Sequence, residues 1–140
     1  MAIRPYLTYS GDCAEAIELY KRAFNTDTIE CLRFTDMPPS ISVPEDRLGW
    51  VLQAKLRLGG DFIRMSDCGP AHTLNEAESE RISLAVEASI AEVKRAFEAL
   101  AEEGRVAMPL AETFYSPCAG VVFDKFGVMW NFAAVDDQAP

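Results

Sequence analysis

The chain has 140 residues, of which 49% are hydrophobic and 25% are charged, the balance of an ordinary globular domain. Thirteen Lys and Arg stand against 22 Asp and Glu, so the formal net charge is −9 at pH 7. This acidity disfavours nucleic-acid binding, which depends on neutralising phosphates. No apolar run approaches the roughly 20 residues that a membrane span needs, and the N-terminus lacks the apolar stretch of a secretory signal. We therefore expect a cytoplasmic protein that binds neither nucleic acid nor membrane.

The cysteines indicate neither a disulfide framework nor a zinc site. Cys13, Cys31, Cys68 and Cys118 are spread along the chain without a CxxC pair, and His72 is the only histidine. A cytosolic domain of this size holds its own core without disulfides, and structural zinc needs clustered ligands. We expect the four cysteines to act as small, mostly buried apolar residues.

The first half of the chain predicts a short strand, a helix and three further strands. Asp12 and Glu15 have the spacing of a capping box, so a helix is expected from there to about Asn25. Gly59 and Gly60 supply the two-residue loop of a hairpin, because both tolerate positive φ. The later strands are expected over residues 28–34, 48–58 and 61–65, with 38–44 as a mobile loop.

The second half repeats this order. Ser89 and Glu92 form another capping-box pair, and Gly104 is expected to supply the left-handed residue that ends the helix. Strands are expected over residues 81–87, 106–108, 119–123 and 128–133, and residues 67–80 are expected to form a linker. About 60 residues bury too little surface to be stable alone. We therefore expect one domain, residues 1–140, built from modules at about 3–67 and 80–135.

Two segments carry a family resemblance. The opening PYLTYSGDCAEAIELYKRAF and the later block MPLAETFYSPCAGVVFDKFGVMWNF resemble segments of PhnB-like proteins. The duplicated βαβββ order resembles that of the vicinal oxygen chelate superfamily, which holds glyoxalase I, bleomycin-resistance proteins and extradiol dioxygenases. The resemblance covers about residues 3–133. It implies an α+β fold in which duplicated modules form a curved mixed sheet around a ligand cavity, usually as a homodimer.

The resemblance also implies where metal-using relatives place their His and Glu ligands. In this chain those positions fall on Pro5, Gln53, Arg81 and Asn131. Pro5 and Arg81 cannot bind a divalent cation through their side chains. Gln53 and Asn131 offer only neutral amide oxygens. We therefore expect no metal cofactor.

Some members of the branch are described as demethylubiquinone methyltransferases. The chain shows no Gly-rich turn from a strand into a helix that would hold a nucleotide-like methyl donor. The order of its predicted elements is also wrong for a dinucleotide-binding fold. We do not expect methyl transfer.

Polar and aromatic residues remain as candidates for a small-molecule pocket. The resemblance implies that Gln53, Arg81 and Asn131 face the cavity, with Arg81 holding an anionic or carbonyl oxygen. The alternative for these three is a satisfied polar network inside the sheet. Phe114 and Tyr115 would form a lid that stacks on a ligand, unless Phe114 fills the core.

Several strand residues have a structural interpretation. Trp130 is expected in the core or at a dimer contact. Arg33 and Arg64 are expected on solvated outer faces, because Arg is seldom fully buried without a partner. Tyr6 and Tyr9 fit a core, a cavity or an interface equally well.

Three functions compete. The missing metal ligands favour a metal-independent module that binds an unidentified small molecule, as bleomycin-resistance proteins do. The alternative is a lyase, isomerase or dioxygenase-like enzyme that acts on a small oxygenated substrate, with Glu112 as base or metal ligand. A fold retained for a protein–protein role, with a filled cavity, is the third. The residues leave open whether the protein is an enzyme.

Overall fold

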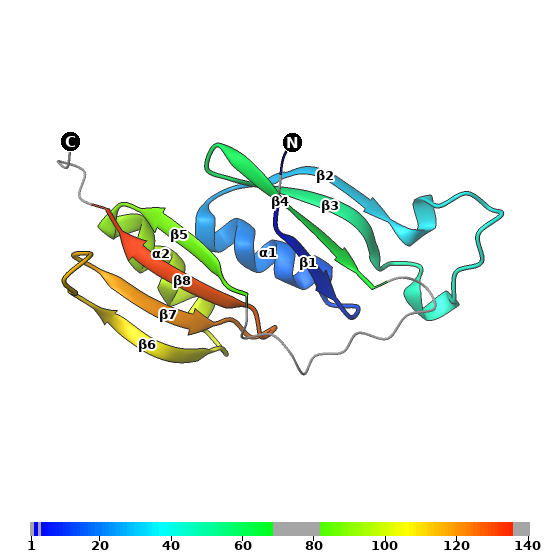
Figure 1. Cartoon of the computed structure of the whole chain (residues 1–140). Helices are drawn as coiled ribbons and strands as arrows, with labels where there is room; N and C mark the ends of the chain where they lie inside the picture. Colours follow the sequence, from blue (N-terminus) through cyan, green and yellow to red (C-terminus); the bar gives the residue numbers. More distant parts are fainter. Residues whose placement is uncertain (1, 3, 69–81, 136–140) are drawn as a thin grey trace. The chain divides into compact units, whose positions relative to one another are not determined.

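The computed structural model describes residues 2, 4–68 and 82–135 (Figure 1). The chain divides into two compact units, Met1–Asn75 and Glu76–Pro140, and each is described by itself. Within the described residues, every helix is too short or too polar to cross a bilayer.

The N-terminal unit is a four-stranded mixed sheet with one helix. Its strand order is β1-β4-β3-β2, with β1 and β4 parallel and the other neighbours antiparallel. Two 3-10 turns, η1 and η2, lie between β2 and β3, and no helix or strand covers residues 38–44. The elements are β1 (Tyr6–Tyr9), α1 (Cys13–Phe24), β2 (Thr28–Arg33), η1 (Phe34–Asp36), η2 (Glu45–Arg47), β3 (Val51–Leu58) and β4 (Asp61–Asp67).

The C-terminal unit repeats this topology. Its strand order is β5-β8-β7-β6, again with only the first pair parallel. The elements are β5 (Leu84–Ala88), α2 (Ile90–Ala101), β6 (Arg105–Ala111), β7 (Ala119–Phe123) and β8 (Met129–Ala134). The predicted α+β fold with duplicated βαβββ modules is confirmed.

In the N-terminal unit, α1 packs on one face of the sheet. Ala54 and Leu56 of β3 are fully buried, and their register partners on β4, Met65 and Ile63, are buried with them. Successive strand residues point to opposite faces. The residues between these four therefore lie on the face that α1 does not cover (Figure 1).

In the C-terminal unit, α2 covers one face in the same way. Phe97 of α2 meets Phe132 of β8 edge to face, with ring centroids 5.8 Å apart. Trp130 is fully buried on the same strand, and its indole N–H donates to Asp124 Oδ2 at 2.9 Å. Of the two places predicted for Trp130, the core and a dimer contact, the structure shows the core. Asn131 lies between Trp130 and Phe132 and is exposed on the opposite face.

The two helices begin differently. The predicted capping box of α2 is present, since Ser89 Oγ accepts from Glu92 N–H at 3.2 Å and Glu92 accepts in return. The capping box predicted for α1 is wrong, because Asp12 makes no side-chain cap. The buried carboxylate of Asp67 takes that role and accepts the N–H of Cys13 at 3.0 Å. A charged acceptor at the positive helix end removes the need for a local cap.

For the C-terminal ends of the two helices, one prediction is confirmed and one is wrong. α1 ends at Asn25, as expected, and Asn25 itself lies in the left-handed region at φ 49°. After α2 the left-handed residue is Glu103 at φ 58°, so the prediction for Gly104 is wrong. Gly104 has a different reason to be glycine. A Cβ there would lie 2.7 Å from the Leu100 carbonyl oxygen and closer still to that of Phe123.

Strand boundaries also differ from the expectation. Asp67, assigned to the linker, ends β4, and β6 extends over Arg105–Ala111 rather than 106–108. β3 begins at Val51 and β5 at Leu84, later than predicted. Residues 69–81, most of the predicted linker, lie outside the described residues.

Candidate functional site

Gln53 lies on the face of the N-terminal sheet opposite α1, which we call the open face. Residues paired across strands share a face. Arg64 of β4 pairs with Tyr6 on one side and with Lys55 on the other. Gln53 is two residues from Lys55 on β3 and therefore shares its face. The open face consists of Tyr6, Thr8, Glu30, Leu32, Gln53, Lys55, Arg57, Phe62, Arg64 and Ser66.

Asn131 occupies the helix-free face of the C-terminal sheet. Its cross-strand partners are Ala85 on β5 and Val121 on β7. These apolar neighbours do not compete for the amide of Asn131, which is exposed. Arg81, predicted to act with Gln53 and Asn131, lies outside the described residues.

Glu112, Phe114 and Tyr115 lie in the turn between β6 and β7. Thr113 N–H donates to the Ser116 carbonyl at 2.9 Å, and Ser116 N–H donates to Thr113 Oγ1 at 3.1 Å. The buried Ser116 hydroxyl donates to the Ala134 carbonyl at 2.6 Å, which ties the turn to β8.

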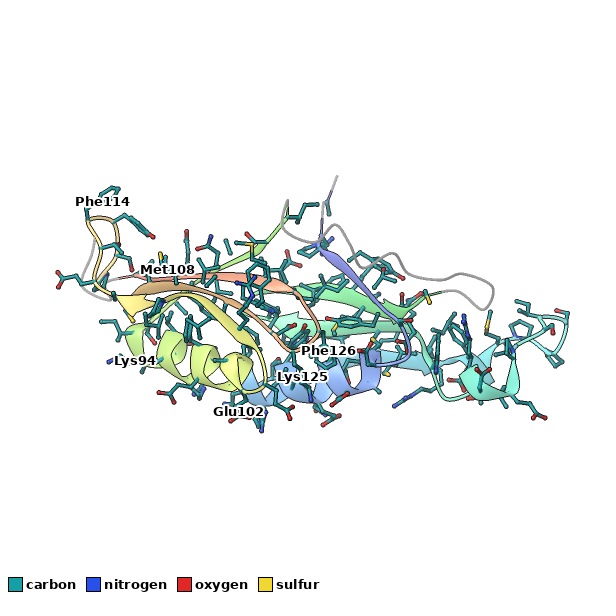
Figure 2. All side chains as sticks on the ribbon, turned by 90° about the horizontal axis from the view of Figure 1, so that it is seen from below. Lys94, Glu102, Met108, Phe114, Lys125 and Phe126 are labelled. Carbon is teal, nitrogen blue, oxygen red and sulfur yellow. The ribbon has the colours of Figure 1, made fainter. Side chains whose placement is uncertain are left out.

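This turn presents two aromatic rings to solvent. Phe114 is fully exposed and Tyr115 is 57% exposed, and their ring centroids lie 5.2 Å apart in an edge-to-face contact. Figure 2 shows Phe114 at the tip of the turn. The alternative in which Phe114 fills the core is therefore wrong. Glu112 is exposed as well.

The divalent metal that the fold family implies does not fit these residues. The only oxygen of Pro5 is its carbonyl, which accepts the N–H of Arg64 at 3.0 Å in the pairing of β1 with β4. Gln53 and Asn131 supply neutral amides, which are weak ligands for such an ion. Over residues 2, 4–68 and 82–135, no three or more His, Cys, Asp or Glu side chains cluster as a metal site would require.

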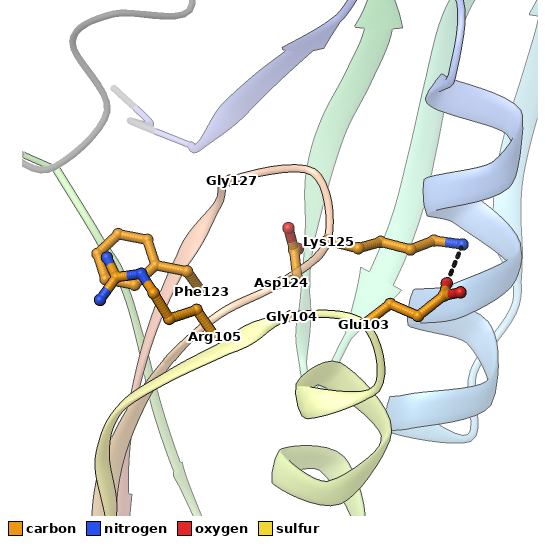
Figure 3. Close-up of a pocket in the computed structure, with 7 residues that line it drawn as sticks. All are labelled: Glu103, Gly104, Arg105, Phe123, Asp124, Lys125 and Gly127. Atoms are coloured by element: carbon orange, nitrogen blue, oxygen red, sulfur yellow. Dashed lines mark hydrogen bonds and ion pairs between the residues drawn. The ribbon is translucent and has the colours of Figure 1, made fainter.

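A pocket of about 380 Å³ lies beside the β7–β8 turn and contains none of the predicted site residues (Figure 3). Its charged groups pair with their neighbours. Lys125 lies 3.4 Å from Glu103, and the Arg105 guanidinium lies 4.3 Å from the centroid of the Phe123 ring. Asp124 accepts the backbone N–H groups of Phe126 and Val128. These groups stabilise the turn, so we place the candidate site on the open face instead. The pocket is lined by Glu103, Gly104, Arg105, Phe123, Asp124, Lys125 and Gly127.

Sequence reasoning missed two features. The alternation of Gln53, Lys55 and Arg57 along β3 places three hydrogen-bond donors on one face, and this period of two is visible in the sequence. The role of Asp67 has no local signal, because its partners are distant in sequence.

Burial, together with the neighbouring Asp67, raises the pKa of the Cys13 thiol, which therefore stays protonated.

The chain matches one protein family over nearly its whole length. Residues 1–133 match the model of the family described as 3-demethylubiquinone-9 3-methyltransferase. Protein YjdN of Escherichia coli is 31% identical over 147 residues, which cover 99% of this chain and 98% of YjdN. The chain belongs to this PhnB-like family.

Solved structures agree with this assignment. Protein PA1353 from Pseudomonas aeruginosa has a TM-score of 0.84 and 33% identity, covering 98% of this chain and 99% of that one. A PhnB protein from Bacillus cereus has a TM-score of 0.78 and 25% identity, covering 96% and 100%. The fosfomycin resistance protein FosX from Listeria monocytogenes shares the fold alone, with a TM-score of 0.64, 13% identity and coverage of 99% and 94%. The glyoxalase/bleomycin-resistance-like fold is confirmed.

Proposed function

We propose that the protein is a metal-independent module that binds a small oxygenated molecule. The donor set of the open face carries the proposal. Gln53 offers an amide there, Tyr6 and Ser66 offer hydroxyls, and the Tyr6 hydroxyl donates to Ser66 Oγ at 3.0 Å. Small-molecule sites typically combine apolar side chains with a few polar groups, and the open face also carries Leu32 and Phe62.

The predicted site residues of the C-terminal unit, taken by themselves, have similar chemistry. We propose that Asn131 and Arg81 bind oxygen atoms of a small molecule, and that Phe114 and Tyr115 stack on an apolar group. The exposure of the two rings supports this role, because they are not needed in the core of their unit. Their turn is held by hydrogen bonds, so the rings are presented with little loss of backbone freedom on binding.

The enzyme alternative lacks a supporting observation. A lyase, isomerase or dioxygenase-like reaction would use Glu112 as base or metal ligand, and Glu112 is exposed. A general base is normally tuned by burial and by neighbouring groups. Methyl transfer, to which the family's description refers, is not part of the proposal either, because neither βαβββ unit has the doubly wound sheet that binds nucleotides.

We further propose that the working form is a cytoplasmic homodimer without a cofactor, in which residues 1–140 form a single domain. The net charge of −9 supports the absence of nucleic acid among its partners. The family resemblance supports the dimer.

Native mass spectrometry on protein purified without added metal or chelator tests this proposal. We expect a dimer of apo mass, with or without a co-purified small molecule. A stoichiometric divalent ion would contradict the proposal of metal-independent binding and favour the alternative that the protein is an enzyme.

Thermal-shift screening with small oxygenated molecules, in the presence and absence of EDTA, tests binding. We expect a molecule that binds to raise the Tm of the wild type equally with and without EDTA, and not to raise the Tm of Gln53→Leu. The control Glu98→Gln, on the exposed surface of α2, should keep the full rise. A rise that disappears with EDTA, or that is equal in both variants, contradicts the proposal.

A further inference from the structure

Two cations lie directly opposite each other on the open face. Lys55 of β3 pairs in register with Arg64 of β4. The Cβ atoms of such a pair are about 4.5–5.5 Å apart, and like charges at this spacing destabilise an antiparallel sheet. Arg57, two residues further along β3, places a third cation on the same face. These three cations therefore repel one another on one sheet face, although the net charge of the chain is −9.

The open face only partly neutralises this charge. Lys55 Nζ lies 3.5 Å from Glu30 Oε2, across the β2–β3 pair. Over the part of the chain that the structure describes, no carboxylate lies within ion-pair distance of Arg57 or Arg64. Arg64 is half-buried, so its charge is less well solvated than that of an exposed arginine. A missing counter-charge of this kind is what an anionic ligand supplies.

Neutral donors lie beside the two cations. Ser66 is two residues from Arg64 on β4, and Gln53 is two residues from Lys55 on β3, so the four side chains share the open face. Ser66 Oγ accepts from the Tyr6 hydroxyl at 3.0 Å. Its own hydrogen is then left to donate to another acceptor. Lys, Arg, Ser and the Gln amide can all donate hydrogen bonds to one acceptor group.

We infer that the open face binds a small organic anion through a carboxylate or phosphoryl group held between Lys55 and Arg64. Gln53 and Ser66 donate to the remaining oxygens. The inference rests on the proposed function and specifies the class of its small molecule. Charge-assisted hydrogen bonds from Arg to such oxygens are short and frequently bidentate, and the anion relieves the repulsion between the two cations.

The binding test uses three probes on the full-length protein: inorganic phosphate, benzoate and the neutral benzamide. Isothermal titration calorimetry should show binding of at least one of the two anions, weakening as salt increases. Benzamide should bind roughly tenfold more weakly or not at all. Comparison of phosphate with benzoate distinguishes the two kinds of oxyanion. Failure of both anions to bind at 10 mM, or equal binding of benzamide, would overturn the inference.

Variants locate the site. Arg64→Met and Lys55→Met should each weaken anion binding by roughly 10–100-fold. Arg64→Lys should restore much of it. Lys94→Met, which removes the same charge from the exposed surface of α2, should bind like the wild type. Equal affinity in Lys55→Met and Lys94→Met would contradict the inference.

Stability in phosphate-free buffer gives an independent readout. Because each Met substitution removes the like-charge pair, Arg64→Met should unfold at the same Tm as the wild type or higher. A fall of several degrees in Arg64→Met, with no rescue of binding by Arg64→Lys, would mean that Arg64 is only structural. Binding of neutral oxygenated molecules that depends on Gln53 but not on Lys55 would refute the anion and leave the proposed function standing.

Discussion

The carboxylate of Asp67, at the end of β4, accepts the backbone N–H of Cys13 at 3.0 Å across 54 positions of sequence. The same oxygen accepts the N–H of Gly11 at 2.7 Å, and the second oxygen accepts that of Val51 at 2.9 Å. Asp67 is buried, at 4% exposure. One side chain therefore fastens the start of α1 and the start of β3 to the last strand of the module.

Replacing Asp67 by Asn should destabilise the protein strongly. The amide turns one acceptor into a donor that faces a backbone N–H, and it removes the charge from the other hydrogen bonds. We expect the free energy of unfolding to fall by about 2–4 kcal/mol in urea denaturation. Asp61→Asn, which breaks an exposed ion pair with Arg4, is the matched control and should cost much less. Equal losses in the two variants would contradict the anchoring role of Asp67.

Structural features that depend on residues close together in the sequence were predicted correctly. The capping box of α2 joins residues three apart, and Gly59–Gly60 join two strands directly, so both were found. The cap of α1 was not, because Asp67 lies 54–56 positions from its partners Gly11 and Cys13. Gly104 was expected to be the left-handed end of the helix, because the contact that its Cβ would make with the Phe123 carbonyl on β7 is distant in sequence.

The candidate site was predicted in part. Gln53 and Asn131 lie on helix-free faces, where alternation along a strand places them. The exposure of Phe114 depends on how the Thr113–Ser116 turn closes, which periodicity does not show. Arg64 was expected on a solvated face as an isolated residue. Its pairing with Lys55 depends on the register of β3 with β4, and only the structure defines that register.

Gly104→Ala should be destabilising despite the ordinary φ of Gly104. The added Cβ would approach the carbonyl oxygens of Leu100 and Phe123, and backbone atoms cannot rotate away. We expect a loss of about 1–3 kcal/mol in the free energy of unfolding. Gly60→Ala is the control, because nothing lies within 4 Å of its Cβ. Thermal unfolding of the two variants measures the difference, and a tolerated Gly104→Ala would refute the steric argument.

Thiol reactivity should separate the four cysteines. Cys31 is exposed, whereas Cys13, Cys68 and Cys118 are buried. The raised pKa of Cys13 also keeps it in the unreactive thiol form. A chromogenic thiol reagent at pH 8 should modify about one thiol per native chain and all four in denaturant. Loss of the fast reaction in Cys31→Ser identifies the site, and rapid modification of Cys13 would contradict its burial.

Alkaline pH should weaken the fold through Cys13. Its pKa is raised in the folded state by burial, so the unfolded thiol releases its proton first, near its ordinary value of 9.0. The stability that Cys13 contributes is complete below that pH and is lost as the pH rises above it. Urea denaturation between pH 7 and 10.5 should show a smaller decline in Cys13→Ala than in the wild type. Parallel declines would contradict the assignment to Cys13.

The parallel pairing of β1 with β4 sets an order of events during synthesis. Tyr6 lies beside Arg64, so the first strand has no partner until nearly the whole N-terminal module has been made. At 5–20 residues per second, the ribosome needs about 3–12 s to produce the intervening chain. Until β4 has been made, β1 remains backbone without its strand partner, whereas β2 and β3 can already pair with each other.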